Sequence, residues 1–198
     1  MHDYGSCFNI AHIELSSEIY GPGKRFVIWL QGCSLACPGC WNKIMWNFTP
    51  RIIIQREVLL EEILANPELE GVTFLGGEPL QQSENLYWLM LALNKKNISI
   101  MLYTGYEIED ICNTKIFSNI CNLADILIAG RYREEERDLF LRWRGSRNQL
   151  LLIQTNRYCD LEILDGINEI EIKIDEFGSV TLLGYPTDCI LPEFSSFK

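Results

Sequence analysis

Apolar runs of strand length recur along the chain and are nearly continuous, as expected for strands buried on both faces. They lie at residues 8–15, 25–31, 71–77, 97–104, 124–130 and 149–155. Between some of them, apolar residues recur at three- and four-residue spacing, at 56–66, 84–96 and 106–117. That spacing is typical of helices that bury one face. The alternation predicts an α/β fold in which helices cover a parallel sheet, in a barrel-like or doubly wound arrangement.

The end of the chain has a different pattern. Isoleucines at positions 170, 172 and 174 alternate with charged residues, which predicts a strand with one solvated face. Gly178 then marks a turn before a second apolar run at 179–185. We therefore expect a core domain at 1–160 and a C-terminal β-hairpin extension at 161–198, packed on the core.

Composition limits the class of protein. The chain has 198 residues, of which 47% are hydrophobic, enough for one core of ordinary size. No run approaches the roughly 20 apolar residues that span a bilayer, and the N-terminus lacks a signal-peptide pattern. We expect a cytoplasmic protein without a membrane partner. Its 27 acidic and 17 basic residues give a net charge of −10, which argues against binding to nucleic acid.

Three of the eight cysteines, Cys33, Cys37 and Cys40, fall within one short stretch. In a cytoplasmic chain such a group favours metal or cluster ligation over disulfides. The other cysteines receive no role and are expected to be small buried hydrophobic residues, at Cys7, Cys112, Cys121, Cys159 and Cys189.

The spacing of the three cysteines fits two kinds of site. A structural zinc ion normally has four protein ligands, and His12 or Cys7 could supply the fourth. A [4Fe–4S] cluster can instead be held at three corners by thiolates, which leaves one iron open to another ligand. Spacing alone does not decide between them.

The motif Cys33-x-x-x-Cys37-x-x-Cys40 resembles the signature of the radical S-adenosylmethionine (radical SAM) superfamily. The resemblance implies a partial (β/α) barrel and a [4Fe–4S] cluster whose open iron is chelated by S-adenosylmethionine (SAM). A second motif, Gly76-Gly77-Glu78-Pro79, resembles the superfamily segment that contacts the SAM amino group. Glycines allow close approach of the backbone, and a glutamate can accept hydrogen bonds from an ammonium group.

The resemblance also suggests further cofactor contacts. Thr104, at the end of a strand, would reach the ribose or the carboxylate of SAM. Asn148 and Gln149 open a strand and would face the cofactor. Trp41 or backbone groups would hold adenine, because Gly39 stands where the superfamily often has an aromatic residue. No residue is assigned as a catalytic acid or base.

Residues 21–33, 124–132 and 139–149 resemble the small activases of glycyl-radical enzymes, most closely those of anaerobic ribonucleotide reductase. The resemblance implies hydrogen abstraction from a glycine of a partner enzyme and an electron donor such as flavodoxin or ferredoxin. Two positions depart from that family: Tyr20 stands where an acidic residue is expected, and Ala129-Gly130 stands where Asp-Gly is expected. A second hypothesis is therefore a radical SAM enzyme that acts directly on a peptide, nucleoside or small molecule.

The arginine-rich segment 131–147 allows two interpretations. It mixes six arginines with acidic residues, as a solvated face of weak ion pairs would. Alternatively, Arg142 and Arg144, which flank Trp143, receive a carboxylate, a phosphate or a partner loop. A third hypothesis for the whole protein is a zinc-stapled binding module without enzymatic activity that uses this face.

Overall fold

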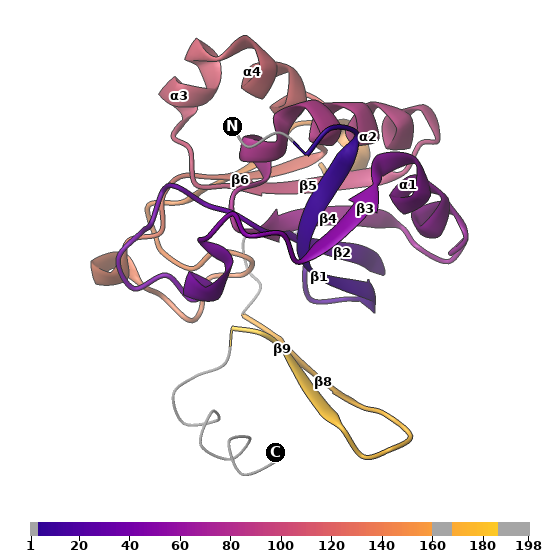
Figure 1. Ribbon diagram of the computed structural model, residues 1–198. Coiled ribbons are helices and arrows are strands. Elements are labelled where there is room, and N and C mark those ends of the chain that lie inside the picture. Colours follow the sequence, from indigo (N-terminus) through magenta and orange to yellow (C-terminus); the bar gives the residue numbers. More distant parts are fainter. Residues whose placement is uncertain (1–3, 160–167, 186–198) are drawn as a thin grey trace.

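A seven-stranded sheet forms the centre of the computed structural model, which describes residues 4–159 and 168–185 (Figure 1). Its order is β3-β1-β2-β4-β5-β6-β7. The four middle strands are parallel: β2 (Arg25–Leu30), β4 (Gly71–Gly76), β5 (Ser99–Thr104) and β6 (Ile126–Ala129). The outer strands are antiparallel to their neighbours: β1 (Cys7–Ser17), β3 (Ile52–Gln55) and β7 (Leu150–Ile153).

The α-helices lie together on one face of the sheet (Figure 1). They are α1 (Arg56–Leu64), α2 (Ser83–Lys95), α3 (Ile108–Asn113) and α4 (Lys115–Cys121). The main core lies between them and the strands, where Ile28, Phe74 and Leu102 pack against Leu86 and Leu89 of α2. In the described part of the chain, four short 3-10 helices lie in the connections: η1 (Lys43–Met45), η2 (Pro79–Gln82), η3 (Glu134–Glu136) and η4 (Asn156–Tyr158).

The opposite face of the sheet is covered by loops and by a hairpin, β8 (Ile170–Ile174) and β9 (Val180–Gly184). Because side chains alternate along a strand, Val27 and Trp29 of β2 point to this face and pack with Leu183 of the hairpin. This second face is where the structure has room for a site.

The predicted α/β class is confirmed, and each predicted strand corresponds to an observed one. The expected helix at 106–117 is two helices, because Thr114 takes extended backbone angles between them. Strand β3 was missed, since Ile52 and Ile53 of this edge strand are about half exposed and do not alternate. The sheet is parallel only at its centre, so the expectation of a parallel sheet holds for the middle strands.

The hairpin is present, but the wrong face was assigned to solvent. Ile172 and Ile174 are 46% and 70% exposed, whereas the charged residues between the isoleucines turn towards β1. Lys173 donates to Glu14 at 2.7 Å, and Glu171 accepts from Ser17. Ion pairing with β1 thus sets the orientation. The predicted domain boundary near residue 160 lies outside the described residues.

The scattered cysteines behave differently from one another. Cys121 is buried as expected, Cys7 is partly buried, and Cys112 and Cys159 are exposed, contrary to the expectation. Cys189 lies outside the described residues. No helix in the described ranges is long and apolar enough to cross a membrane.

A fully buried arginine joins the amino-terminal ends of the central strands. Arg25 donates from Nε to Thr73 Oγ1 at 2.6 Å and from Nη2 to the Val72 carbonyl at 2.7 Å. It also donates to Ser99 Oγ at 3.3 Å, which in turn accepts from Tyr158. Burial lowers the pKa of Arg25. The guanidinium therefore ties β2, β4 and β5 together at the edge opposite their carboxyl ends.

Replacing Arg25 by methionine is expected to lower the free energy of unfolding by about 3 kcal/mol or more, because several buried acceptors lose their donor. Urea denaturation would measure the loss. The matched control is Lys24→Met, which removes only an exposed ion pair with Glu68 and should cost less than about 1 kcal/mol. Equal costs for the two variants would contradict a structural role for Arg25.

Candidate functional site

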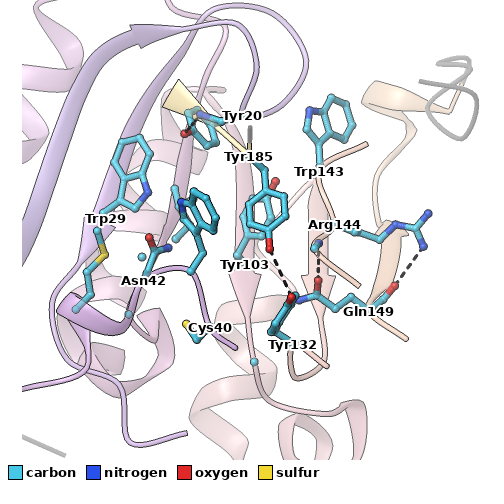
Figure 2. Close-up of a pocket in the computed structure, with 18 of the residues that line it drawn as sticks. Tyr20, Trp29, Cys40, Asn42, Tyr103, Tyr132, Trp143, Arg144, Gln149 and Tyr185 are labelled. Carbon is cyan, nitrogen blue, oxygen red and sulfur yellow. Dashed lines mark hydrogen bonds between the residues drawn. The ribbon is translucent and has the colours of Figure 1, made fainter. Parts of the chain in front are cut away.

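A cavity of about 480 Å³ lies at the carboxyl ends of the parallel strands and extends over the sheet face away from the helices (Figure 2). The turns that follow β2, β4, β5 and β6 contribute Cys33, Gly77, Gly105 and Gly130. The sheet face contributes Trp29 and Tyr103, and the hairpin contributes the residues from Leu183 to Tyr185. Segments distant in sequence therefore meet at one site.

The loop that carries the three cysteines is held by its own backbone. The Gly32 N–H donates to the Met45 carbonyl at 2.9 Å, and the Cys33 N–H donates to the Trp46 carbonyl at 2.9 Å. The Cys40 N–H donates to the Cys37 carbonyl at 3.1 Å. All three cysteines line the cavity.

Two positions show how tightly the cysteine loop is wound. Gly32 has a φ of +102°, and a Cβ there would come within 2.4 Å of the Phe48 ring. Ala36, between the first two cysteines, has a φ of +46°, which is unfavourable for a residue with a Cβ. The loop keeps this strained conformation at the place where the thiols gather.

The thiols fit a group larger than a single ion. No three His, Cys, Asp or Glu side chains among residues 4–159 and 168–185 converge closely enough to hold one metal ion. His12 instead packs against Trp29, with ring centroids 5.1 Å apart, and Cys7 does not line the cavity. The described residues thus offer no four-ligand zinc site of the kind left open by the sequence. Three thiols on one loop beside a cavity suit an iron–sulfur cluster held at three corners.

Burial raises the pKa of Cys33 to about 11 and also raises the pKa of Cys37. Without a positive partner these thiols would stay protonated at neutral pH. Bound iron would supply the positive charge that favours the thiolate, so cluster binding and loss of the thiol protons would be coupled.

The glycine pair of the second motif packs directly on the cysteine loop. The Gly77 N–H donates to the Leu30 carbonyl at 2.7 Å, and the Glu78 N–H donates to the Gly32 carbonyl at 2.9 Å. A Cβ on Gly77 would lie 2.4 Å from the Gly32 oxygen, and a Cβ on Gly76 would lie 2.6 Å from the Leu30 nitrogen. Only glycine at both positions allows this contact.

Glu78 joins the turns after β4 and β5. Its side chain is 1% exposed and accepts hydrogen bonds from the Leu80 N–H at 3.0 Å, the Thr104 hydroxyl at 2.9 Å and the Gly105 N–H at 2.7 Å. Burial raises the pKa of Glu78 to about 7, against the opposing effect of these donors. Glu78 and Thr104 both line the cavity. The expected contact between Glu78 and the SAM ammonium group stays a prediction.

The other predicted contact residues are placed differently. Trp41 lines the cavity, 44% exposed, with its ring centroid 4.8 Å from that of Tyr185. Gln149 also lines the cavity, but its Oε1 accepts from the Gly145 N–H at 2.9 Å and from Ser146. Asn148 does not line it and donates to the Arg131 carbonyl at 2.7 Å. The side chains of both amides are thus hydrogen-bonded to protein backbone.

Several aromatic lining residues were not singled out from the sequence. Trp29 and Tyr103 occupy positions on β2 and β5 that alternate with core residues, and this alternation could have revealed them. Tyr132 and Tyr185 come from loop and hairpin segments, and no sequence pattern pointed to them. The hydroxyls of these two tyrosines lie 3.4 Å apart (Figure 2).

Some arginines of the segment 131–147 form surface ion pairs, as the first interpretation expects, and others lie at the cavity. Arg133 pairs with Glu136 and Arg147 pairs with Asp138, each at 2.9 Å on an exposed surface. Arg142 and Arg144 instead line the cavity, on either side of Trp143.

Fold and site together define an α/β protein with an iron–sulfur site at the carboxyl ends of its parallel strands. Comparison with known families agrees. The sequence profile of the 4Fe-4S single cluster domain matches residues 19–152. A relative from Enterobacteria phage T4, an anaerobic ribonucleoside-triphosphate reductase-activating protein, is 32% identical over 146 residues, which are 70% of this chain and 89% of the relative.

A protein of the same description from Haemophilus influenzae is 29% identical over 142 residues, 67% of this chain and 90% of the relative. The crystal structure of QueE from Escherichia coli has a TM-score of 0.40 and 22% identity, and covers 50% of this chain and 52% of QueE. The chain belongs to the 4Fe-4S single cluster domain family and, within it, to the anaerobic ribonucleoside-triphosphate reductase-activating proteins.

Family membership confirms the predicted resemblance to the radical SAM activases and the predicted cofactors, a [4Fe–4S] cluster and SAM. It also confirms that the chain is an enzyme. The hairpin β8–β9 lies beyond residue 152, where the family match ends.

Each of the variants Cys33→Ala, Cys37→Ala and Cys40→Ala is expected to lose the full cluster, because two thiolates leave half of its irons without a protein ligand. Iron and sulfide analysis after anaerobic reconstitution would measure the loss. Cys112→Ala, which removes an exposed thiol on α3, is the matched control and should keep the cluster. A full cluster in any of the three variants would refute the ligand assignment.

The raised pKa of Glu78 predicts a pH dependence of stability. Since the folded pKa lies above the ordinary glutamate value of 4.5, the stabilising contribution of the protonated form is lost as pH rises towards about 7. Glu78→Gln does not titrate, so its stability relative to the parent should increase between about pH 5 and about pH 8. Denaturation of the cofactor-free protein at both pH values would measure this. A relative decrease would mean that Glu78 is ionised and has a lowered pKa.

Proposed function

We propose that this enzyme activates an anaerobic ribonucleoside-triphosphate reductase by removing a hydrogen atom from a glycine Cα of that partner. The observation that carries the proposal is the match to activating proteins over about two thirds of the chain. It is supported by the position of three thiols beside a cavity that is large enough for further ligands.

Cys33, Cys37 and Cys40 would hold the cluster, and the turns at Gly77 and Thr104 would lie against SAM. When bound, the cluster would pass one electron from the donor protein to SAM, whose carbon–sulfur bond would break to give methionine and the 5′-deoxyadenosyl radical that removes the hydrogen atom. The protein contributes binding, orientation and exclusion of competing reactions.

Exclusion of water is the contribution that is clearest from the cavity wall. The wall is rich in aromatic side chains, among them Trp29, Trp41, Trp46, Tyr103 and Tyr132. A reactive radical needs such shielding, because side reactions with solvent would otherwise consume it. Transfer of a hydrogen atom requires no general base, which agrees with the absence of an assigned acid or base.

The partner is a protein, so one of its loops must reach the cavity. The electron donor in this proposal is a small redox protein such as flavodoxin or ferredoxin, as the radical SAM resemblance implies.

A second candidate is direct modification of a peptide, nucleoside or small molecule. Its support is the contact between Tyr20, which departs from the activase pattern, and the hairpin, which lies beyond the family match. Tyr20, found where an acidic residue is expected, accepts a hydrogen bond from the Gly184 N–H at 2.7 Å. Gly184 belongs to the hairpin, which lies beyond the family match and forms part of the cavity wall. This wall would change what enters the cavity.

Anaerobic reconstitution followed by reduction in the presence of SAM tests the proposal. The protein is incubated with and without the reductase polypeptide of the same organism. 5′-Deoxyadenosine is measured by mass spectrometry and the glycyl radical by electron paramagnetic resonance. Both are expected from the parent protein, and neither from a variant in which all three cysteines are replaced.

The products separate the candidates. 5′-Deoxyadenosine without a radical on the reductase would favour direct modification. A fully loaded protein that forms neither product, with or without the reductase, would overturn the radical SAM proposal.

A further inference from the structure

The segment Arg142–Arg144 forms a side of the cavity on which only Gln149 is assigned to the cofactor, and the amide of Gln149 is already bonded to backbone groups. In Figure 2, Trp143, Arg144 and Gln149 lie on one side of the pocket, and Trp29, Asn42 and Cys40 lie on the other. A cofactor attached at the cysteine loop and the glycine pair therefore lies across the cavity from this segment.

Three consecutive residues of the segment carry buried hydrogen-bond donors without partners. These atoms are Arg142 Nε, Trp143 Nε1 and Arg144 Nε. Buried polar groups in native proteins are nearly always paired, and an unpaired one costs free energy. Three unpaired donors on consecutive residues indicate a segment whose hydrogen-bond acceptors are supplied by a bound ligand.

The backbone of the segment shows a second, independent sign. Trp143 has a φ of +60°, a conformation that is rare for a bulky side chain and concentrated at functional sites. The base of the segment is nevertheless firmly held. Gln149 accepts from the Gly145 and Ser146 N–H groups, and its own carbonyl accepts from Arg144 Nη1 at 3.2 Å. The donors are thus presented on a fixed turn.

The chemistry of the segment defines its ligand. Within the described residues, the buried unpartnered side-chain atoms that belong to the cavity wall are all N–H donors, the fourth being Trp46 Nε1. A set of donors requires acceptors, and guanidinium groups prefer carbonyl or carboxylate oxygens. The head group of Arg142 is partly neutralised by Glu169 of the hairpin region, 3.5 Å away.

Building on the proposed function, we propose that Arg142, Trp143 and Arg144 bind backbone carbonyl oxygens of the polypeptide loop that carries the target glycine. An extended loop presents a carbonyl at every residue and no side chain at glycine, so its main chain can approach this wall closely. The segment is therefore the substrate-binding wall, and the cysteine loop across the cavity is the cofactor wall.

The test uses conservative variants. Trp143→Phe removes only the indole N–H donor and keeps a ring, and the double variant Arg142→Lys/Arg144→Lys keeps both charges but removes both Nε donors. The controls are Trp88→Phe on α2 and Arg133→Lys, which make the same chemical changes away from the cavity. Affinity for the reductase polypeptide of the same organism is measured anaerobically with cluster-loaded protein. SAM affinity and partner-free 5′-deoxyadenosine formation are measured in parallel.

We expect about tenfold weaker reductase binding for each cavity variant, as the loss of charged or paired hydrogen bonds would give. SAM affinity and partner-free SAM cleavage should stay within about twofold of the parent, and the controls should resemble the parent in every assay. Weaker SAM binding with unchanged reductase binding would assign the donors to the cofactor carboxylate and overturn the proposal. Unchanged binding of both ligands would also overturn it.

Failure of the proposed function gives a different result. The parent protein would then cleave SAM but bind no reductase, whereas failure of the substrate-wall inference alone leaves reductase binding by the parent intact.

Discussion

The contact between the turns after β2 and β4 is the constraint on which the site depends. Parallel strands end at the same edge, and here the pairing continues beyond the strands, from Gly77 to Leu30 and from Glu78 to Gly32. Because any Cβ on Gly77 would collide with the Gly32 oxygen, two distant motifs require each other. Glu78 extends the same bonding to Thr104 at the end of β5 and to Gly105 in the turn that follows. One hydrogen-bonded series thus positions the ligand loop and the neighbouring strand ends.

The elements that could be predicted from the sequence are those with a uniform environment or a short local motif. Strands buried on both faces have continuous apolar runs, and the cysteine spacing identified the cluster loop. The edge strand β3 was missed because half-exposed residues such as Ile52 carry no clear period. The hairpin orientation depends on ion pairs between Lys173 and Glu14, which are 159 positions apart, so no local pattern contains it. The hydrogen-bonded roles of Asn148 and Gln149 are likewise tertiary.

The hairpin and Tyr20 are best understood together. Burial raises the pKa of Tyr20 to about 12, and its hydroxyl remains a neutral acceptor for the Gly184 N–H. The same ring packs edge-on against Trp29, 5.0 Å away, on the cavity side of the sheet. An acidic side chain at position 20 would place a charge beside these aromatic residues. The departure from the activase pattern therefore accompanies an added wall of the cavity.

Arg25 and the cluster loop lie at opposite ends of β2. The guanidinium network secures the amino-terminal ends of the strands, while the turns at the carboxyl ends hold the reactive groups. This separation has an evolutionary consequence. The loops at the carboxyl ends, which determine the substrate, can change in evolution while the Arg25 network keeps the sheet folded. A new specificity therefore requires no compensating substitution at the amino-terminal ends of the strands.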